Sequence, residues 1–133
     1  SSVASIRNEL QESMEVNAKI FRTEKTLADQ QEILGELREK SKNINVSDKG
    51  TVFNTELLEA IELEYLLDMS DATVGSAIMR KESRGAHTRE DYPERDDENY
   101  LKHTFITKDS GGKLEVNYKD VELGKYEPME RKY

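Results

Sequence analysis

The spacing of apolar residues predicts two amphipathic helices in the first part of the chain. The first helix carries one stripe at intervals of three and four residues, formed by Val3, Ile6, Leu10, Met14, Ala18 and Phe21. The pattern breaks near Thr23, and either Thr23 or Thr26 can cap a second helix; Thr26 and Asp29 make a weak capping box. The second helix runs to about Lys42, with Leu27, Leu34 and Leu37 inward and Ile33 at the edge of the stripe. A connection rich in Asn, Ser, Asp and Gly follows over residues 43–50.

A third helix is predicted from about Asn54 or Thr55 to Lys81, and it is apolar on two faces. One face carries Leu58, Ile61, Tyr65, Met69, Ala72 and Met79, and a second stripe lies nearly opposite, with Leu63, Leu67, Val74 and Ile78. The first two helices can cover one face only. Either the second stripe widens the core contact or packs on the tail, or it belongs against a partner domain. We favour the partner domain, and an exposed second stripe could also make the chain self-associate.

The periodicity changes from helical to alternating after Leu101. Phe105 and Ile106 begin a β-prone stretch, KDSGGK supplies a turn, and a second alternating run follows with Leu114, Val116 and Tyr118. Because a two-stranded hairpin is marginal alone, it should lie on the bundle or on another body. The predicted fold is mainly α. An antiparallel three-helix bundle like a spectrin repeat (residues 1–82) precedes a charged docking loop (83–103) and a β-hairpin with an extended tail (104–133), all in one structural domain.

Composition narrows the classes of function. The 133 residues are 36% charged and 35% hydrophobic, so the core must be a lean one. A net charge of −8 argues against nonspecific nucleic-acid binding and against docking on an anionic membrane. The chain has no cysteine, which is compatible with a cytosolic protein, and no apolar run approaches the roughly 18 residues of a membrane span.

The usual signatures of catalysis and cofactor binding are missing from the sequence. The glycines form neither GxGxxG nor GxxxxGK[ST], the two histidines are not in HExxH, and GSAIM around Ser76 is not the GxSxG nucleophile elbow. The carboxylates are so numerous that most should simply solvate the surface. No catalytic, cofactor-binding or metal-ligating residue is therefore assigned.

The run KESRGAHTREDYPERDDENYLKHT, residues 81–104, combines arginines, acids, tyrosines and both histidines. Alternating charges at close range can pair through planar arginine–carboxylate contacts, and Pro93 stiffens the path. Gly85 suits a left-handed C-cap of the third helix, and Tyr92 and Tyr100 can anchor the segment through buried rings. The residues alone leave three interpretations open: a disordered surface loop, an ordered interdomain clamp, or a catalytic loop.

This run closely resembles the segment near the C-terminus of the flavoprotein subunit of succinate dehydrogenase and fumarate reductase. The shared order is ESRGAH, then R-x-D-Y-P-x-R-D-D, then L-K-H-T. The helix ELLEAIELEYLLDMSDATVGSAIMRK, the earlier MEVNAKIFRTEKTL and the closing P-M-E-R-K-Y also look like that family. L-aspartate oxidase is the nearest related family, and the fuller charged motif favours the dehydrogenase. The resemblance covers essentially the whole chain but only about the last quarter of a typical subunit.

The resemblance implies a role inside an oxidoreductase that interconverts succinate and fumarate. The full subunit binds FAD in an upstream domain, a capping domain closes on the dicarboxylate, and electrons leave through an iron–sulfur subunit. None of the family's flavin-linking, substrate-clamping or proton-donating residues maps onto this chain. We therefore expect no cofactor in the isolated chain and no activity from it. The parent enzyme is expected in the cytoplasm, associated with the membrane through other subunits and without direct membrane insertion by this chain.

The charged loop is then expected to be an ordered clamp that docks on the FAD-binding domain of the same subunit or on the iron–sulfur subunit. The predicted docking residues are Arg84, Gly85, His87, Arg89, Asp91, Tyr92, Arg95, Asp97 and His103. In one alternative the arginines pair only with acids inside the segment, and in another His87 or Arg89 reaches the edge of the active site. For the whole chain, the alternative to a flavoprotein domain is a free-standing helical adaptor without catalytic activity.

Overall fold

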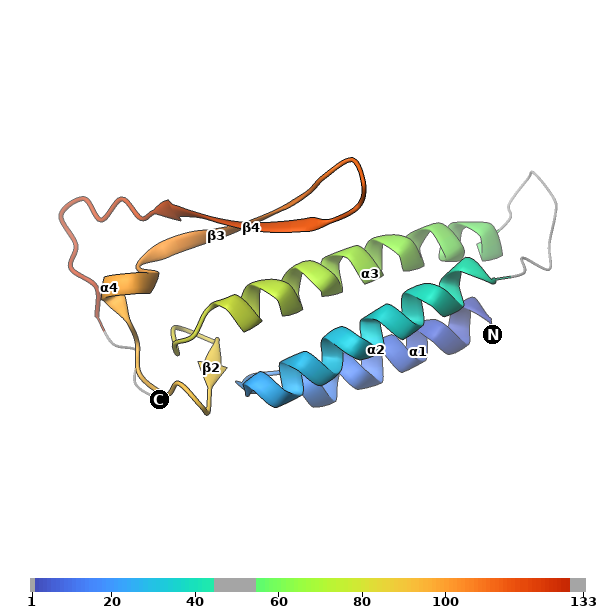
Figure 1. Cartoon of the computed structure of the whole chain (residues 1–133), viewed down its shortest axis with the longest axis horizontal. Coiled ribbons are helices and arrows are strands. Elements are labelled where there is room, and N and C mark those ends of the chain that lie inside the picture. The colour runs from blue at the N-terminus through green and yellow to red at the C-terminus, as the bar shows by residue number, and fades with distance from the viewer. Residues whose placement is uncertain (1, 45–54, 130–133) are drawn as a thin grey trace.

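The structure, a computed structural model, describes residues 2–44 and 55–129. Its elements in chain order are α1 (Val3–Asn17), β1 (Phe21–Arg22), α2 (Glu24–Lys42), α3 (Thr55–Met79), β2 (Thr88–Arg89), α4 (Asp97–Tyr100), β3 (Lys102–Lys108) and β4 (Leu114–Asp120). Each of the three long helices runs antiparallel to the next along the chain, with α1 and α2 on one side of α3 and the β3–β4 hairpin on the other (Figure 1). The predicted bundle and hairpin are confirmed. Most of the predicted 43–50 connection, and Asn54, lie outside the described residues.

The helix starts are set by side-chain caps. Ser2 accepts a hydrogen bond from the backbone N–H of Ser5 at 3.1 Å. Thr23 caps α2 through a reciprocal capping box with Thr26, so the predicted pairing of Thr26 with Asp29 is wrong; Asp29 instead accepts from Lys25 at 2.7 Å. The helix α1 ends four residues before Phe21, whose side chain is 67% exposed. The chain turns there, which places Phe21 and Arg22 beside the charged loop.

The core lies between α3 and the α1–α2 pair. It is formed by Val3, Ile6, Leu10, Ala18, Leu27, Leu34, Leu37, Leu63, Leu67, Val74 and Ala77. Gln30 is also fully buried and is satisfied there, since it accepts from Asn17 and donates to Ser13, both at 3.0 Å. The second stripe of α3 is thus the core face, and the expectation that it awaits a partner domain is wrong. The face toward solvent is the first stripe.

The hairpin packs on α3, on a different side of that helix from the core (Figure 1). Thr104, Ile106, Leu114 and Val116 are half-buried, while Phe105 is 47% exposed on the other side of the ladder. Lys108 fixes the far end of the hairpin by donating to Asp68 of α3 at 2.9 Å. Gly112 closes the turn at φ 85°, a conformation that favours glycine. The predicted hairpin and its place on the bundle are confirmed, and no described helix has the length and apolarity of a membrane span.

The assignment of the two faces of α3 predicts opposite effects for neighbouring substitutions. Leu67→Ala removes a fully buried side chain and should lower the free energy of unfolding by about 3 kcal/mol. Met69→Ala, at a position that is 67% exposed, should change it by less than about 0.5 kcal/mol. Urea denaturation followed by circular dichroism measures both. A larger loss for Met69→Ala than for Leu67→Ala would reverse the assignment.

Candidate functional site

The charged loop begins with a tight turn rather than at a helix cap. The backbone N–H of Arg84 donates to the carbonyl of His87 at 2.8 Å, and the N–H of His87 donates back at 3.0 Å. Gly85 takes φ 59° at the first central position of this turn, six residues after α3 has ended, so its predicted role as the C-cap of α3 is wrong. Its left-handed conformation was predicted correctly, but it serves to reverse the chain.

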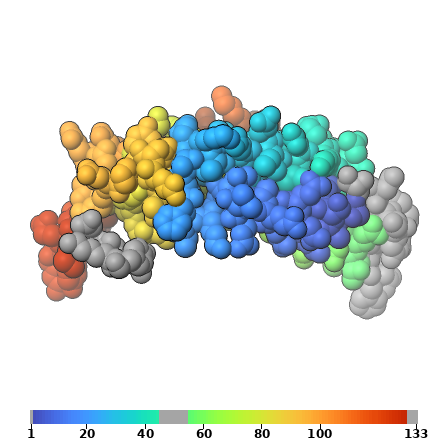
Figure 2. Space-filling model, turned by 90° about the horizontal axis from the view of Figure 1, so that it is seen from below, coloured from blue at the N-terminus to red at the C-terminus, as the bar shows by residue number. Residues whose placement is uncertain are grey.

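The loop is joined to the chain between α1 and α2 by a short parallel pairing. The strand β2 pairs with β1 so that Thr88 lies opposite Phe21 and Arg89 opposite Arg22. The N–H of Glu90 extends the pairing by donating to the carbonyl of Arg22 at 2.8 Å. Figure 2 shows this part of the loop (yellow) packed against the segment that links the two helices (blue). Contacts more than sixty residues apart in sequence therefore order the loop.

Arg89 is the centre of the loop. Its side chain is fully buried, and all five of its N–H groups are used. Nε and Nη2 form a bidentate pair with Asp91, both at 2.9 Å, and Nη2 also donates to Glu24 of α2 at 2.9 Å. Nη1 donates to the carbonyls of Ala77 and Ile78 in the last turn of α3, both at 3.1 Å. A cation at a helix C-terminus is favoured by the helix dipole.

Asp91, the partner of Arg89, also binds the start of α2. Its second oxygen accepts from the first backbone N–H of α2, that of Glu24, at 2.9 Å. The hydrogen bonds from Arg89, with that from Glu24, lower the pKa of Asp91 to about 2. Because this pKa is depressed, the ionised carboxylate stabilises the fold above the ordinary value near 3.8, and the contribution is lost as the pH falls through about 2. One ion pair thus caps the end of α3 and the start of α2.

A second buried charge, Glu82, organises the other half of the loop. One carboxylate oxygen accepts from Arg80 at 2.5 Å and from Arg84 at 2.8 Å, and the other from Arg84 at 3.0 Å and the N–H of Asp96 at 2.8 Å. Burial pushes the pKa of Glu82 upward, but the hydrogen bonds from Arg84, Asp96 and Arg80 outweigh it, and the pKa lies below its ordinary value. Glu82 is therefore a paired, ionised carboxylate and not a proton donor.

Arg80 connects the end of α3 to the hairpin. It donates to the carbonyls of Tyr100 and Lys102 at 2.7 and 2.6 Å, and to the Thr104 hydroxyl at 2.9 Å. The sequence alone indicated no individual role for Arg80 or Glu82, nor for Arg22 and Glu24. Glu82 lies inside the charged run and Arg80 directly precedes it, so the charge density of the run was the only signal for either residue. Arg22 and Glu24 lie where the helical pattern breaks, which was the one available signal.

The structure brings all of the predicted docking residues together in the charged loop except His103. Arg84, Gly85, His87, Arg89 and Asp91 lie together in the turn and the β1–β2 pairing. Asp97 joins them through Arg84 at 2.6 Å and pairs with Arg95 at 3.0 Å. The Tyr92 ring is 39% exposed and has the Arg89 guanidinium 5.1 Å from its centroid. His103 stands apart in β3, so the last two residues of the predicted loop belong to the hairpin.

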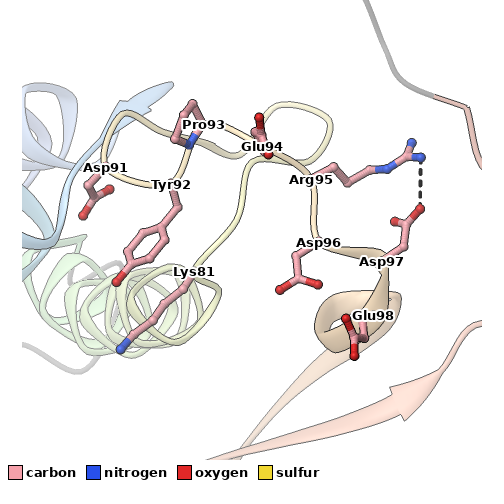
Figure 3. Close-up of a pocket in the computed structure, with 9 residues that line it drawn as sticks. All are labelled: Lys81, Asp91, Tyr92, Pro93, Glu94, Arg95, Asp96, Asp97 and Glu98. Carbon is pink, nitrogen blue, oxygen red and sulfur yellow. Dashed lines mark ion pairs between the residues drawn. The ribbon is translucent and has the colours of Figure 1, made fainter.

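An open hollow of about 550 Å³ lies on the outer side of the loop (Figure 3). Its lining is part polar and part apolar, and it is formed by Lys81, Asp91, Tyr92, Pro93, Glu94, Arg95, Asp96, Asp97 and Glu98. Among the residues that the structure describes, no group of three His, Cys, Asp or Glu side chains is placed to hold a metal ion. Four of its charged side chains are engaged in holding the loop: Arg95 pairs with Asp97, Asp91 pairs with Arg89, and Asp96 caps α4 by accepting from the N–H of Asn99. The arrangement is suited to presenting a rigid surface.

The candidate site is thus a charged loop, held by buried ion pairs, at one end of a bundle whose longest helix has an exposed apolar face. Comparison with known proteins shows that residues 7–133 match the family described as fumarate reductase flavoprotein C-term. The chain belongs to this family and is a C-terminal domain of the succinate dehydrogenase and fumarate reductase flavoproteins, an oxidoreductase family.

Two curated relatives cover nearly the whole chain. The succinate dehydrogenase flavoprotein subunit of Rickettsia bellii is 46% identical over 122 residues, which are 92% of this chain and 20% of that protein. The fumarate reductase flavoprotein subunit of Haemophilus influenzae is 43% identical over 132 residues, which are 99% and 22%. The chain therefore spans about a fifth of the length of the curated relatives it matches.

Solved structures share the fold. A quinol fumarate reductase chain from E. coli superposes with a TM-score of 0.92 at 39% identity, covering 98% of this chain and 23% of that one. Adenylylsulfate reductase from Archaeoglobus fulgidus superposes with a TM-score of 0.81 at 25% identity, covering 90% and 19%. The same fold is thus part of two enzymes that are named for different substrates.

The geometry of Arg89 predicts that lysine cannot replace it. Arg89→Lys keeps the charge but supplies three donors for five acceptor contacts, leaving buried acceptors of α3 or Asp91 without a partner. We expect a loss of about 3 kcal/mol in the free energy of unfolding. Arg95→Lys is the control, because a single ion pair with Asp97 survives it, and it should cost less than about 1 kcal/mol. Equal effects of the two substitutions on urea midpoints would contradict this account of Arg89.

Proposed function

We propose that this chain is the part of a succinate dehydrogenase or fumarate reductase flavoprotein subunit that packs against the FAD-binding domain and holds the subunit together. In this proposal the flavin and the dicarboxylate are bound by other parts of the subunit, which pass electrons to an iron–sulfur subunit. The relatives' own names support the reaction class, since they are succinate dehydrogenase and fumarate reductase subunits. The shared fold of adenylylsulfate reductase supports the view that this domain does not select the substrate.

The observation that carries the proposal is the outward face of α3, defined as Leu58, Ile61, Tyr65, Leu66 and Met69. These side chains are between 41% and 67% exposed, although their spacing places them on one side of the helix. Tyr65, Leu66 and Met69, with Glu62, line a hollow of about 290 Å³ whose surface is mostly apolar. An apolar face of this extent is typical of a surface that another body covers. The FAD-binding domain is the occupant that family membership favours.

The charged loop contributes to the same docking: its partly exposed side chains can contact a partner, and its buried side chains hold the loop in place. Arg84, Arg95 and Asp97 have side chains between 24% and 38% exposed, so they are the groups that can reach the FAD-binding domain or the iron–sulfur subunit. Arg89 has no remaining donor and lies at 0% exposure, so it positions the loop from inside. His103 would reach a partner only from the hairpin.

Association with the membrane is proposed to come through other subunits. One solved relative is a quinol-fumarate reductase with menaquinol molecules, which supports a membrane quinone as the redox partner of the assembly. A cytoplasmic location of this domain and the absence of nucleic-acid binding stay predictions from composition. The alternative of a free-standing adaptor is not favoured, because the relatives in the comparison are subunits of enzymes.

The isolated chain is expected to be colourless and inactive. Purified residues 1–133 should show no flavin absorbance near 450 nm and no succinate-dependent dye reduction, because the proposal assigns flavin and substrate to other parts of the subunit. Absorption spectroscopy and a dye assay on the purified chain make the check. A tightly bound yellow chromophore would show that this domain itself holds the cofactor.

The outward face of α3 should matter only in the complete subunit. Met69→Asp places a carboxylate on that face and should leave the thermal midpoint of the isolated chain nearly unchanged, since Met69 is 67% exposed. In the complete subunit the same change should lower the yield of assembled, flavin-containing protein about tenfold or more, because a buried unpaired charge is costly. Val16→Asp, at a side chain of α1 that is 77% exposed, is the matched control and should assemble normally. Normal assembly of the Met69→Asp subunit would remove the outward face of α3 from the interface.

A further inference from the structure

His87 is held by two hydrogen bonds that together fix its protonation state. Its Nε2 lies 2.9 Å from the carbonyl oxygen of Arg80, and its Nδ1 lies 3.0 Å from Nη1 of Arg22. A carbonyl oxygen only accepts and a guanidinium only donates, so Nε2 must carry the proton and Nδ1 must be bare. The geometry therefore selects the neutral imidazole with its proton on Nε2.

The surroundings of His87 disfavour a second proton. The positive charges of three arginines act on it: Arg22 in β1, Arg80 after the end of α3, and Arg89 in β2. The carboxylates near these arginines are already paired with them, Glu24 and Asp91 with Arg89 and Glu82 with Arg80. Among the described residues His87 itself has no ion pair with a carboxylate. Burial, with the charges of the three arginines, lowers the pKa of the imidazole below its ordinary value.

Protonation would break one of the contacts that join the loop to β1, the hydrogen bond between Arg22 and His87. A proton on Nδ1 would face the Arg22 N–H at 3.0 Å, donor against donor, and would add a fourth positive charge to the cluster. Arg22 cannot simply lose its own proton, because a guanidinium stays charged in a protein. Relief requires Arg22 and the turn at residues 84–87 to move apart, and Arg22 is tied to its own segment because its Nε donates to the carbonyl of Lys19 at 2.6 Å.

We propose that His87 is a proton-operated latch: the neutral ring holds the turn at residues 84–87 against the chain between α1 and α2, and the charged ring loosens this end of the loop. The inference concerns this chain alone and does not depend on the proposed function. When the loop opens, the imidazole regains its ordinary pKa near 6.5. Because the closed state has the lower pKa, the closed loop is fully stabilised above about pH 6.5, and the stabilisation is lost as the pH falls toward the lowered value.

The size of the effect follows from one proton. Between the two pKa values the open state binds one proton more than the closed state, so the opening equilibrium rises by at most about tenfold per pH unit. Four carboxylates that hold the loop, those of Glu82, Asp91, Asp96 and Asp97, stay ionised in this range, since their pKa values are all lowered from ordinary values near 4. Between pH 7.5 and 5.5, protonation of His87 is therefore the change that acts on the turn at residues 84–87.

The test combines the state of the ring with the opening of the loop. Nitrogen-15 NMR of residues 1–133 at about pH 7.5 should show His87 as the Nε2–H tautomer. Amide hydrogen exchange in residues 83–92, corrected for the intrinsic dependence on pH, should show opening that grows several-fold, up to about tenfold per unit, below about pH 6.5.

Two variants separate His87 from general acid effects. His87→Gln keeps a donor for the Arg80 carbonyl and cannot titrate, so its loop opening should be independent of pH in this range. His103→Gln, the same change at the exposed histidine of β3, should behave as the unaltered chain does. A charged or Nδ1–H imidazole at neutral pH, an unaltered chain that does not open on acidification, or acid-dependent opening that survives in His87→Gln would each overturn the proposal. Should His87→Gln fail to fold, the tautomer and the pH profile of the unaltered chain still decide.

Discussion

The buried guanidinium of Arg89 is the contact on which the rest of the structure depends. It binds the last carbonyls of α3, the first residue of α2 and the carboxylate of Asp91, while Asp91 binds the first N–H of α2. Removing a charge from water is costly, and the five hydrogen bonds offset that cost only if all partners stay in place. The loop is therefore as well ordered as the helix ends that it joins. A mixed-charge segment that could have been flexible becomes a fixed part of the bundle.

This internal pairing revises what the arginines of the loop do. The family resemblance led to the prediction that they reach outward to a partner, with pairing inside the segment as the alternative. The geometry favours internal pairing for Arg89 and mostly for Arg84, whose Glu82 partner is fully buried. In the proposed docking, the apolar part of the surface that a partner covers belongs to α3. The loop shapes one end of the domain, and the outward face of α3 offers the area that another body can cover.

Periodicity was enough to predict the three helices, the hairpin and the loop between them, because apolar spacing of 3.6 or 2 residues determines each element locally. It failed to say which stripe of α3 faces inward, since both stripes are equally apolar and only packing on α1 and α2 distinguishes them. Pairing between the arginines and carboxylates of the loop was also predictable from its residues. Its long-range partners Arg22 and Glu24 were not, because a single sequence does not show that segments 65 residues apart meet.

The central claim is that this loop is rigid in the isolated chain, before any partner is bound. Amide hydrogen exchange at neutral pH tests it most directly, through the N–H groups of Arg84, His87 and Glu90, which are bonded to His87, Arg84 and Arg22. The account predicts protection close to that of the core residues of α2 and α3, and little further change in the complete subunit. Fast exchange at these three amides in the isolated chain, with protection appearing only in the complete subunit, would contradict it.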